Sequence, residues 1–206
     1  MECKPEDWKK GKKVFLAIIS LIVAAMAILA VVLVVNNKKA PAAVPEAVPE
    51  TISDNGNIEF TGPEYKPSKV YDDNQKEISL EELADKPMAL IFFNTSNEKS
   101  IEALEIFKKY EEEYSEKVNI IGICILDGVT ETQDSVKKTL NANEININRV
   151  LFDSKYSAKK DYNVDKIPTL VFINKNKQII NTISKDEDIL DDVIHANLEI
   201  LAENYL

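Results

Sequence analysis

From about residue 58 onward, the chain alternates short apolar runs with amphipathic stretches. Four runs have the length and composition of buried strands: MALIFFN at 88–94, VNIIGICIL at 118–126, RVLF at 149–152 and TLVFIN at 169–174. Apolar residues at helical spacing predict helices over 97–116, about 131–142 and 157–162. Strands that alternate with helices predict an α/β sandwich built on a parallel sheet.

The end of the chain adds antiparallel edges to this sheet. TLVFIN continues through KNK into QIINTIS at 178–184, which is the pattern of a hairpin. A terminal helix is predicted over 186–203, with one apolar face formed by Leu190, Val193, Ile194, Leu198 and Leu201. The only histidine, His195, falls roughly 140° from Leu190 on this helix, so we expect it to face solvent.

A different pattern precedes the domain. Residues 14–35 are 22 consecutive residues without a charge, and Ser20 is the only polar one. At about 1.5 Å rise per residue, a helix of this length spans the hydrocarbon core of a bilayer. The tail at 1–13 places four lysines directly before this run, whereas only two follow it closely. We therefore predict a single-pass cell-membrane protein with a cytoplasmic amino terminus and an extracytoplasmic carboxyl-terminal domain.

Residues 36–57 have neither helical nor strand periodicity. They contain AVPE twice in tandem, with prolines at 41, 45 and 49. Prolines at this density favour the extended polyproline II conformation, so we interpret the segment as a spacer. The predicted order is a cytoplasmic tail at 1–13, a transmembrane helix at 14–35, a Pro-rich linker at 36–57 and one domain at 58–206.

Composition excludes several function classes. Acidic residues outnumber basic ones by 35 to 25, so the chain repels phosphate and nucleic-acid binding is not expected. The five glycines form no phosphate-binding loop. One histidine and two well-separated cysteines give no ligand cluster for zinc, iron or haem, so neither a metal nor a cofactor is expected.

Two stretches support a more specific prediction. Residues 69–94 have the pattern of a hairpin with a polar turn at 72–76, a short helix at 79–84 and a first core strand. Later, Ile167-Pro168-Thr169 directly precedes another apolar run. Over about residues 65–185 this order resembles the thioredoxin superfamily, and within it the membrane-anchored thiol-disulfide oxidoreductases of the TlpA-like redoxin type. The resemblance implies a thioredoxin-like three-layer α/β/α sandwich with a mixed central sheet.

That family carries a C-x-x-C pair where the first core strand enters its helix. The corresponding residues here are Asn97 and Ser100, and the tryptophan that usually precedes the pair is Ser96. Disulfide exchange needs a thiolate at the helix amino terminus and a second thiol that resolves the mixed disulfide. An amide and a protonated hydroxyl supply neither, so we expect no catalytic residue at Asn97 or Ser100.

These residues suit a structural role. Thr95, Ser96 and Asn97 all cap helix amino termini well, and Thr95 to Glu98 has the spacing of a capping box. Ser100 shares its helical arc with Phe107, so it is predicted to point into the core.

The resemblance also implies a cis Ile167-Pro168 bond beside this turn. In the family, the backbone before that proline binds the substrate polypeptide. This implies a peptide-binding site at Ser96, Asn97, Ile167, Pro168 and Thr169. From the residues alone, a proline that serves only the conformation of its loop is the alternative.

The two cysteines give no substitute pair in the predicted topology. Cys3 precedes the membrane span, whereas Cys124 lies within an apolar strand beyond it and has the character of a small buried residue. We therefore predict a peptide- or protein-binding module without redox activity. Two alternatives remain: an oxidoreductase that uses a displaced or partner-supplied thiol, which requires Cys124 to be exposed, and a structural scaffold without a binding groove.

Overall fold

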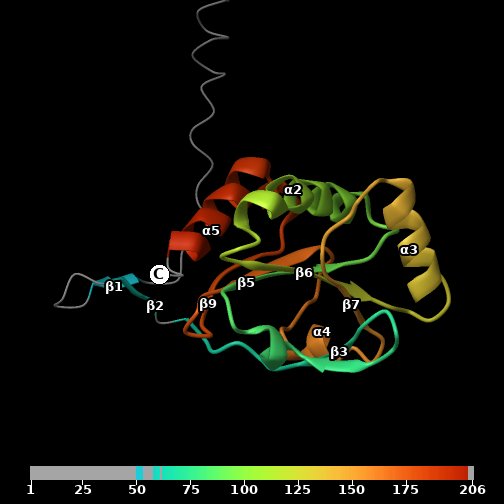
Figure 1. Cartoon of the computed structure of the whole chain (residues 1–206), viewed down its shortest axis with the longest axis horizontal. Coiled ribbons are helices and arrows are strands. Elements are labelled where there is room, and N and C mark those ends of the chain that lie inside the picture. Colours follow the sequence, from blue (N-terminus) through green and yellow to red (C-terminus); the bar gives the residue numbers. More distant parts are fainter. Residues whose placement is uncertain (1–49, 53–57, 61, 204–206) are drawn as a thin grey trace, which may run out of the picture. The chain divides into compact units, whose positions relative to one another are not determined.

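The computed structural model describes residues 50–52, 58–60 and 62–203, and an α/β domain occupies the last of these ranges (Figure 1). Its strands are β3 (Lys69–Tyr71), β4 (Glu77–Ser79), β5 (Met88–Phe93), β6 (Asn119–Ile125), β7 (Val150–Asp153), β8 (Thr169–Ile173) and β9 (Ile179–Ile183). Its helices are α2 (Glu98–Tyr114), α3 (Gln133–Ala142), α4 (Ser157–Asp161) and α5 (Asp191–Glu203), with 3-10 turns η1 (Leu80–Leu83) and η2 (Asp186–Asp188). Strands and helices follow the predicted order.

The seven strands form one mixed sheet in the order β4-β3-β7-β6-β5-β8-β9. Strands β5, β6 and β7 are parallel, while β8, β9, β3 and β4 join as antiparallel edges. Every residue of β5 is buried, as expected for a strand that is covered on both faces. The predicted parallel core with antiparallel edges is therefore confirmed.

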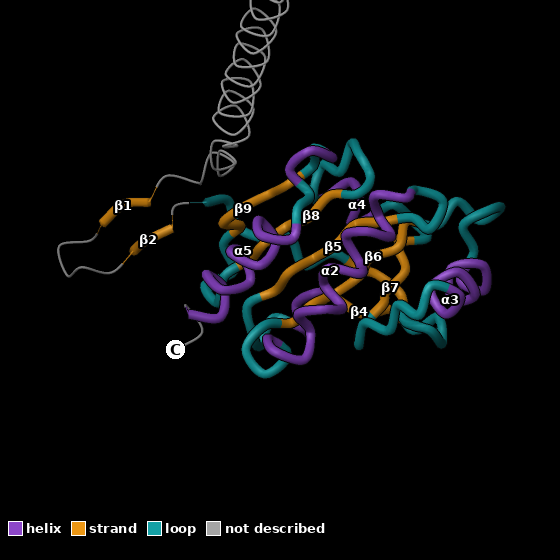
Figure 2. Tube along the Cα trace, turned by 90° about the horizontal axis from the view of Figure 1, so that it is seen from above, coloured by secondary structure: helices purple, strands orange, loops and turns teal. Residues whose placement is uncertain are grey.

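Helices cover both faces of this sheet. Figure 1 places α2, α3 and α5 on one face and α4 on the other. Each face has its own apolar cluster, one around Phe107 and Phe172 and the other around Phe92 and Leu80. Seen from above, α2 and α5 lie beside each other over the sheet (Figure 2). The result is the predicted three-layer α/β/α sandwich.

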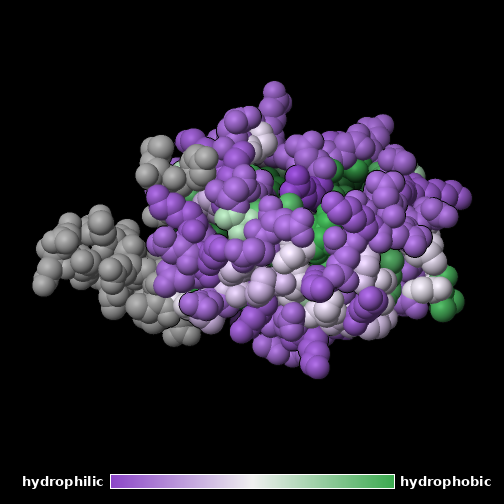
Figure 3. Space-filling view, turned by 60° about the horizontal axis from the view of Figure 1, so that its bottom comes forward, coloured by the Kyte–Doolittle hydropathy of each residue, from purple (hydrophilic) through white to green (hydrophobic). Residues whose placement is uncertain are grey.

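The outer surface is largely polar. Figure 3 shows one side of the molecule, where hydrophilic side chains predominate and apolar ones are visible mainly in recesses. In residues 62–203, the large apolar side chains that are exposed are Val129, Tyr156 and Ile200.

The carboxyl-terminal helix starts later than predicted. Instead of one helix over 186–203, the short turn η2 is followed by a break and then by α5 from Asp191. The break lies at Ile189, whose ψ of 83° is not helical and whose side chain is 2% exposed. Burying Ile189 under the helices turns the chain out of a continuous helix.

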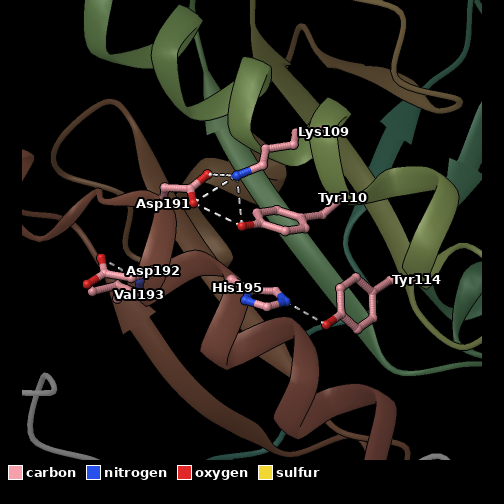
Figure 4. A network of polar contacts seen from close by, with 7 residues as sticks. All are labelled: Lys109, Tyr110, Tyr114, Asp191, Asp192, Val193 and His195. Atoms are coloured by element: carbon pink, nitrogen blue, oxygen red, sulfur yellow. Dashed lines mark hydrogen bonds and ion pairs between the residues drawn. The ribbon is translucent and has the colours of Figure 1, made fainter.

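His195 lies on α5 and packs against α2, so it is half-buried and does not face solvent freely as predicted (Figure 4). Its ring stacks on Tyr110, with ring centroids 4.5 Å apart and an angle of 6° between the planes. Its Nε2 atom lies 3.0 Å from the Tyr114 hydroxyl. Helical spacing predicts only the apolar face of α5 that meets the sheet, whereas α2 covers a second face of this helix.

The same interface contains a polar cluster at the start of α5 (Figure 4). Lys109 Nζ donates to Asp191 Oδ1 at 2.9 Å, and the Tyr110 hydroxyl donates to Asp191 Oδ2 at 2.9 Å. The bond to Asp191 raises the pKa of Lys109, and the bond from Lys109 lowers the pKa of Asp191. Burial raises the pKa of Tyr114 to about 12. These contacts hold α5 against α2, whose amino terminus faces the candidate site.

Part of the predicted linker forms a strand. Strands β1 (Glu50–Ile52) and β2 (Ile58–Phe60) pair antiparallel in a separate two-stranded sheet. In the sequence, the turn-forming residues SDNGN separate them. All described residues belong to one compact unit.

The predicted tail 1–13, the predicted transmembrane helix 14–35 and Cys3 lie outside the described residues. Within the described ranges, no helix has both the length and the apolar character that a membrane span requires.

Candidate functional site

The candidate site begins where β5 ends and α2 starts. Asn97 is the amino-terminal cap of α2, with φ −99° and ψ 117°, and its Oδ1 accepts a hydrogen bond from the Ser100 amide at 3.1 Å. The expected capping box from Thr95 to Glu98 is absent, because the helix starts at Glu98 and the Thr95 side chain bonds elsewhere. Of the three capping residues predicted, Asn97 fills the role.

The other end of the Asn97 amide reaches the loop before β8. Its Nδ2 donates to the Ile167 carbonyl at 2.9 Å, across 70 residues of sequence. The Ile167-Pro168 peptide bond is cis. The structure thus brings together Asn97, Ile167 and Pro168, which the resemblance placed in one site.

The remaining predicted binding residues lie differently. Ser96 is exposed on the turn, whereas Pro168 is buried. Thr169 is only 3% exposed, and its hydroxyl donates to the Lys166 carbonyl at 2.8 Å. Thr169 also starts β8, where it pairs with Phe92 of β5. Its side chain therefore stabilises the loop from within the fold.

Ser100 points into the core, as predicted. It is 0% exposed, and its hydroxyl has no hydrogen-bond partner among the described residues. An unpaired buried hydroxyl costs about 1–3 kcal/mol of stability. The accessible part of the site is therefore the turn at Ser96 and Asn97, together with Ile167.

Glu131, which the sequence analysis did not single out, holds this turn from the opposite side. Glu131 lies in the loop between β6 and α3, and it is 5% exposed. Its carboxylate accepts from the Ser96 amide at 2.8 Å and from the Thr95 hydroxyl at 3.0 Å. One signal pointed here: parallel strands β5 and β6 end at the same edge of the sheet, so the loops that follow them meet.

The loop that carries Glu131 is ordered by Asp127. The amides of Val129, Thr130 and Glu131 each donate to Asp127 Oδ1 at 2.8 Å. These bonds lower the pKa of Asp127 to about 2, and the bond from the Thr130 hydroxyl contributes most. Glu131 is thus presented to the turn by a loop with its own internal support.

A protein-family comparison identifies the domain. The model of the AhpC/TSA family matches residues 58–182, more than half of the chain. The chain belongs to the AhpC/TSA family. The matched range starts where the predicted domain starts and includes the Asn97 turn, Glu131 and the Ile167-Pro168 loop.

Solved structures support the fold of this AhpC/TSA domain. The pneumococcal exposed lipoprotein thioredoxin Etrx1 of Streptococcus pneumoniae is 18% identical, with a TM-score of 0.52 over 65% of this chain and 98% of that one. A thiol:disulfide interchange protein from Bacteroides sp. is 14% identical, with a TM-score of 0.58 over 69% and 90%. A hypothetical protein of Sinorhizobium meliloti is 15% identical, with a TM-score of 0.60 over 71% and 86%.

At these identities the likeness shows a thioredoxin-like fold and nothing finer. The predicted fold is confirmed at that level. A comparison with curated proteins finds no match.

The AhpC/TSA domain has a cysteine in its core. Cys124 is 0% exposed in β6, opposite Phe93 of β5 and Phe152 of β7. Burial is the main cause that raises the pKa of its thiol well above the ordinary value. The predicted burial of Cys124 is confirmed, and the exposure that the displaced-thiol alternative required is not observed.

Potential metal ligands are dispersed across the domain. Within the part of the chain that the structure describes, no three His, Cys, Asp or Glu residues lie close enough to hold a metal ion together.

Proposed function

We propose that this chain is a redoxin-family domain that binds an extended peptide or a partner protein and does not exchange disulfides. In this proposal Asn97 and Ser100 occupy the C-x-x-C positions of the TlpA-like relatives. Three features support it: Asn97 caps the helix after the first core strand, Ser100 lies in the next turn facing the core, and the Ile167-Pro168 loop lies opposite.

The observation that carries the proposal is the hydrogen bond from Asn97 Nδ2 to the Ile167 carbonyl at 2.9 Å. It joins the helix turn to the loop before Pro168 through an amide, a group without thiol chemistry. Ile167 is partly exposed, and its backbone carries polar groups that an extended chain can pair with. We infer that the predicted peptide-binding site acts through this backbone and through the surfaces of Ser96 and Asn97.

The proposal includes a membrane anchor. Residues 14–35 would cross the cell membrane, with residues 1–13 in the cytoplasm and the redoxin domain outside it. The uncharged run and its lysine-rich first flank support this arrangement. Accessibility of single introduced cysteines to an impermeant thiol reagent in whole cells tests it: a label at residue 163 but not at residue 6 is expected.

An oxidoreductase that works through Cys124 has less support, because the thiol is 0% exposed and its pKa is raised by burial. A scaffold without a binding function is separated from a binding module by experiment. The probe is fluorescent insulin B chain with carbamidomethylated cysteines, which is an extended polypeptide without thiols. The protein is the full chain in lipid nanodiscs.

Fluorescence anisotropy then measures binding of this probe to the wild-type chain, to Pro168→Ala and to the exposed control Pro67→Ala. A binding module predicts saturable binding that Pro168→Ala weakens at least fivefold and Pro67→Ala leaves unchanged. A scaffold predicts no binding, or binding that both variants affect equally. Thermal denaturation of each variant shows whether a loss of binding comes from unfolding.

A further inference from the structure

Asn97 uses both ends of its side-chain amide. Its Oδ1 accepts from the Ser100 amide at 3.1 Å, which is the contribution of the side chain to the helix cap. A serine, threonine or aspartate at this position would cap the helix about as well. The helix therefore does not account for the second bond, from Nδ2 to the Ile167 carbonyl at 2.9 Å.

That carbonyl belongs to the part of the loop that a ligand can use. Pro168 has no amide hydrogen, and Thr169 is already paired with Phe92 within the sheet. Ile167 is partly exposed, so its amide and its carbonyl are backbone groups that an incoming chain can reach. In the described part of the chain, no acceptor bonds the Ile167 amide, whereas Asn97 occupies the carbonyl.

The contact between Asn97 and Ile167 is open to competition. Both residues are partly exposed, so water or a ligand can reach the bond between them. The turn does not depend on this bond alone, because Glu131 holds the Ser96 amide at 2.8 Å from the other side. The Asn97 side chain can therefore leave Ile167 while the backbone of the turn stays in place.

We propose that Asn97 is an internal latch. Its amide occupies the Ile167 carbonyl in the free protein, and an extended polypeptide docks there by displacing it with a backbone N–H of its own. This inference rests on the proposed peptide-binding function and adds a rule for its regulation. Because one neutral hydrogen bond must be exchanged, removing the latch tightens binding by roughly three- to tenfold.

The test uses variants that keep the helix cap and remove the donor. Asn97→Ser retains a capping oxygen but is too short to reach Ile167, and Asn97→Asp retains the capping oxygen without an N–H. Asn146→Ser, at an exposed position outside the site, is the matched control. Each full-length variant in nanodiscs is titrated with the carbamidomethylated insulin B chain, and its melting temperature confirms that it is folded.

The latch predicts that Asn97→Ser and Asn97→Asp both bind the probe three- to tenfold tighter than the wild-type chain, with Asn146→Ser unchanged. Wild-type binding that Asn97→Ser leaves equal or weakens overturns the latch and leaves the binding function intact. If neither the wild-type chain nor any variant binds the probe, the latch and the binding function both fail.

Discussion

The Glu131 carboxylate accepts a hydrogen bond from the Ser96 amide at 2.8 Å, which joins two loops that lie 35 residues apart in the sequence. The Thr95 hydroxyl donates to the same carboxylate. Asn97 bonds the Ile167 carbonyl on the far side. The turn that starts α2 is therefore fixed from two directions, by a loop after β6 and by the loop before β8.

Removing the Glu131 carboxylate should lower the stability of the domain. Glu131→Ala leaves the Ser96 amide and the Thr95 hydroxyl without their buried acceptor, so we expect a loss of about 1–3 kcal/mol in the free energy of unfolding. Glu131→Gln keeps an acceptor oxygen and should lose less. Urea denaturation measures the change as a lower midpoint at constant slope.

The exposed Glu105 on α2 provides the control for this experiment. Glu105→Ala should stay within about 0.5 kcal/mol of the wild-type chain. Equal effects of Glu131→Ala and Glu105→Ala would contradict a supporting role for the Glu131 bonds.

The cap of α2 gives a separate stability prediction. Asn97→Ala and Asn97→Ser both lose the bond to Ile167, but only serine has a side-chain oxygen that can still accept from the Ser100 amide. We therefore expect Asn97→Ala to be less stable than Asn97→Ser by about 1 kcal/mol in urea denaturation. Indistinguishable stabilities would mean that the capping bond contributes nothing measurable.

Stability should fall in acid because of Asp127. Its pKa is lowered from the ordinary 3.8 to about 2 in the folded protein, so its contribution is present above about pH 4 and is lost as the pH falls towards 2. Burial raises the pKa of Glu111, which gives the opposite slope. The comparison is therefore between the wild-type chain and Asp127→Asn.

Urea midpoints measured from pH 5 to pH 2 report this difference. The gap in stability between the wild-type chain and Asp127→Asn should narrow as the pH falls through this range, because protonation removes the advantage of the carboxylate. A gap that stays constant with pH would exclude the Asp127 carboxylate as its source.

The interface between α2 and α5 depends on His195. His195→Ala removes the stack on Tyr110 and the bond with the Tyr114 hydroxyl, so it should lower stability by about 1–3 kcal/mol. Glu187→Ala, exposed in η2, is the control and should have little effect. Differential scanning calorimetry of both variants checks this, and an unchanged melting temperature in His195→Ala would argue against the contact.

Local sequence patterns predicted the elements of this fold because its central strands are covered on both faces. A strand such as β5 must then be apolar throughout, and a helix such as α2 must repeat apolar residues every three or four positions. The same spacing correctly turned Ser100 inward. These properties belong to neighbouring residues, so the sequence records them directly.

Contacts between segments that are far apart in the sequence are harder to predict from it. Glu131 is an ordinary loop carboxylate until β6 is placed beside β5, and only then does it face Ser96. The helical spacing of α5 predicts that His195 faces solvent, because nothing in this helix indicates that α2 lies beside it. The sequence offers three residues that could cap α2, Thr95, Ser96 and Asn97. Which of them does so depends on where β5 ends.

We propose that this redoxin-family domain lacks disulfide exchange because residues 97 and 100 are asparagine and serine. The decisive measurement is the rate at which dithiothreitol reduces insulin in the presence of the full chain. The wild-type chain should not exceed the uncatalysed rate, whereas the double variant Asn97→Cys/Ser100→Cys should accelerate it, since a helix amino terminus favours a thiolate. Turnover by the wild-type chain that Cys124→Ser abolishes would contradict the account.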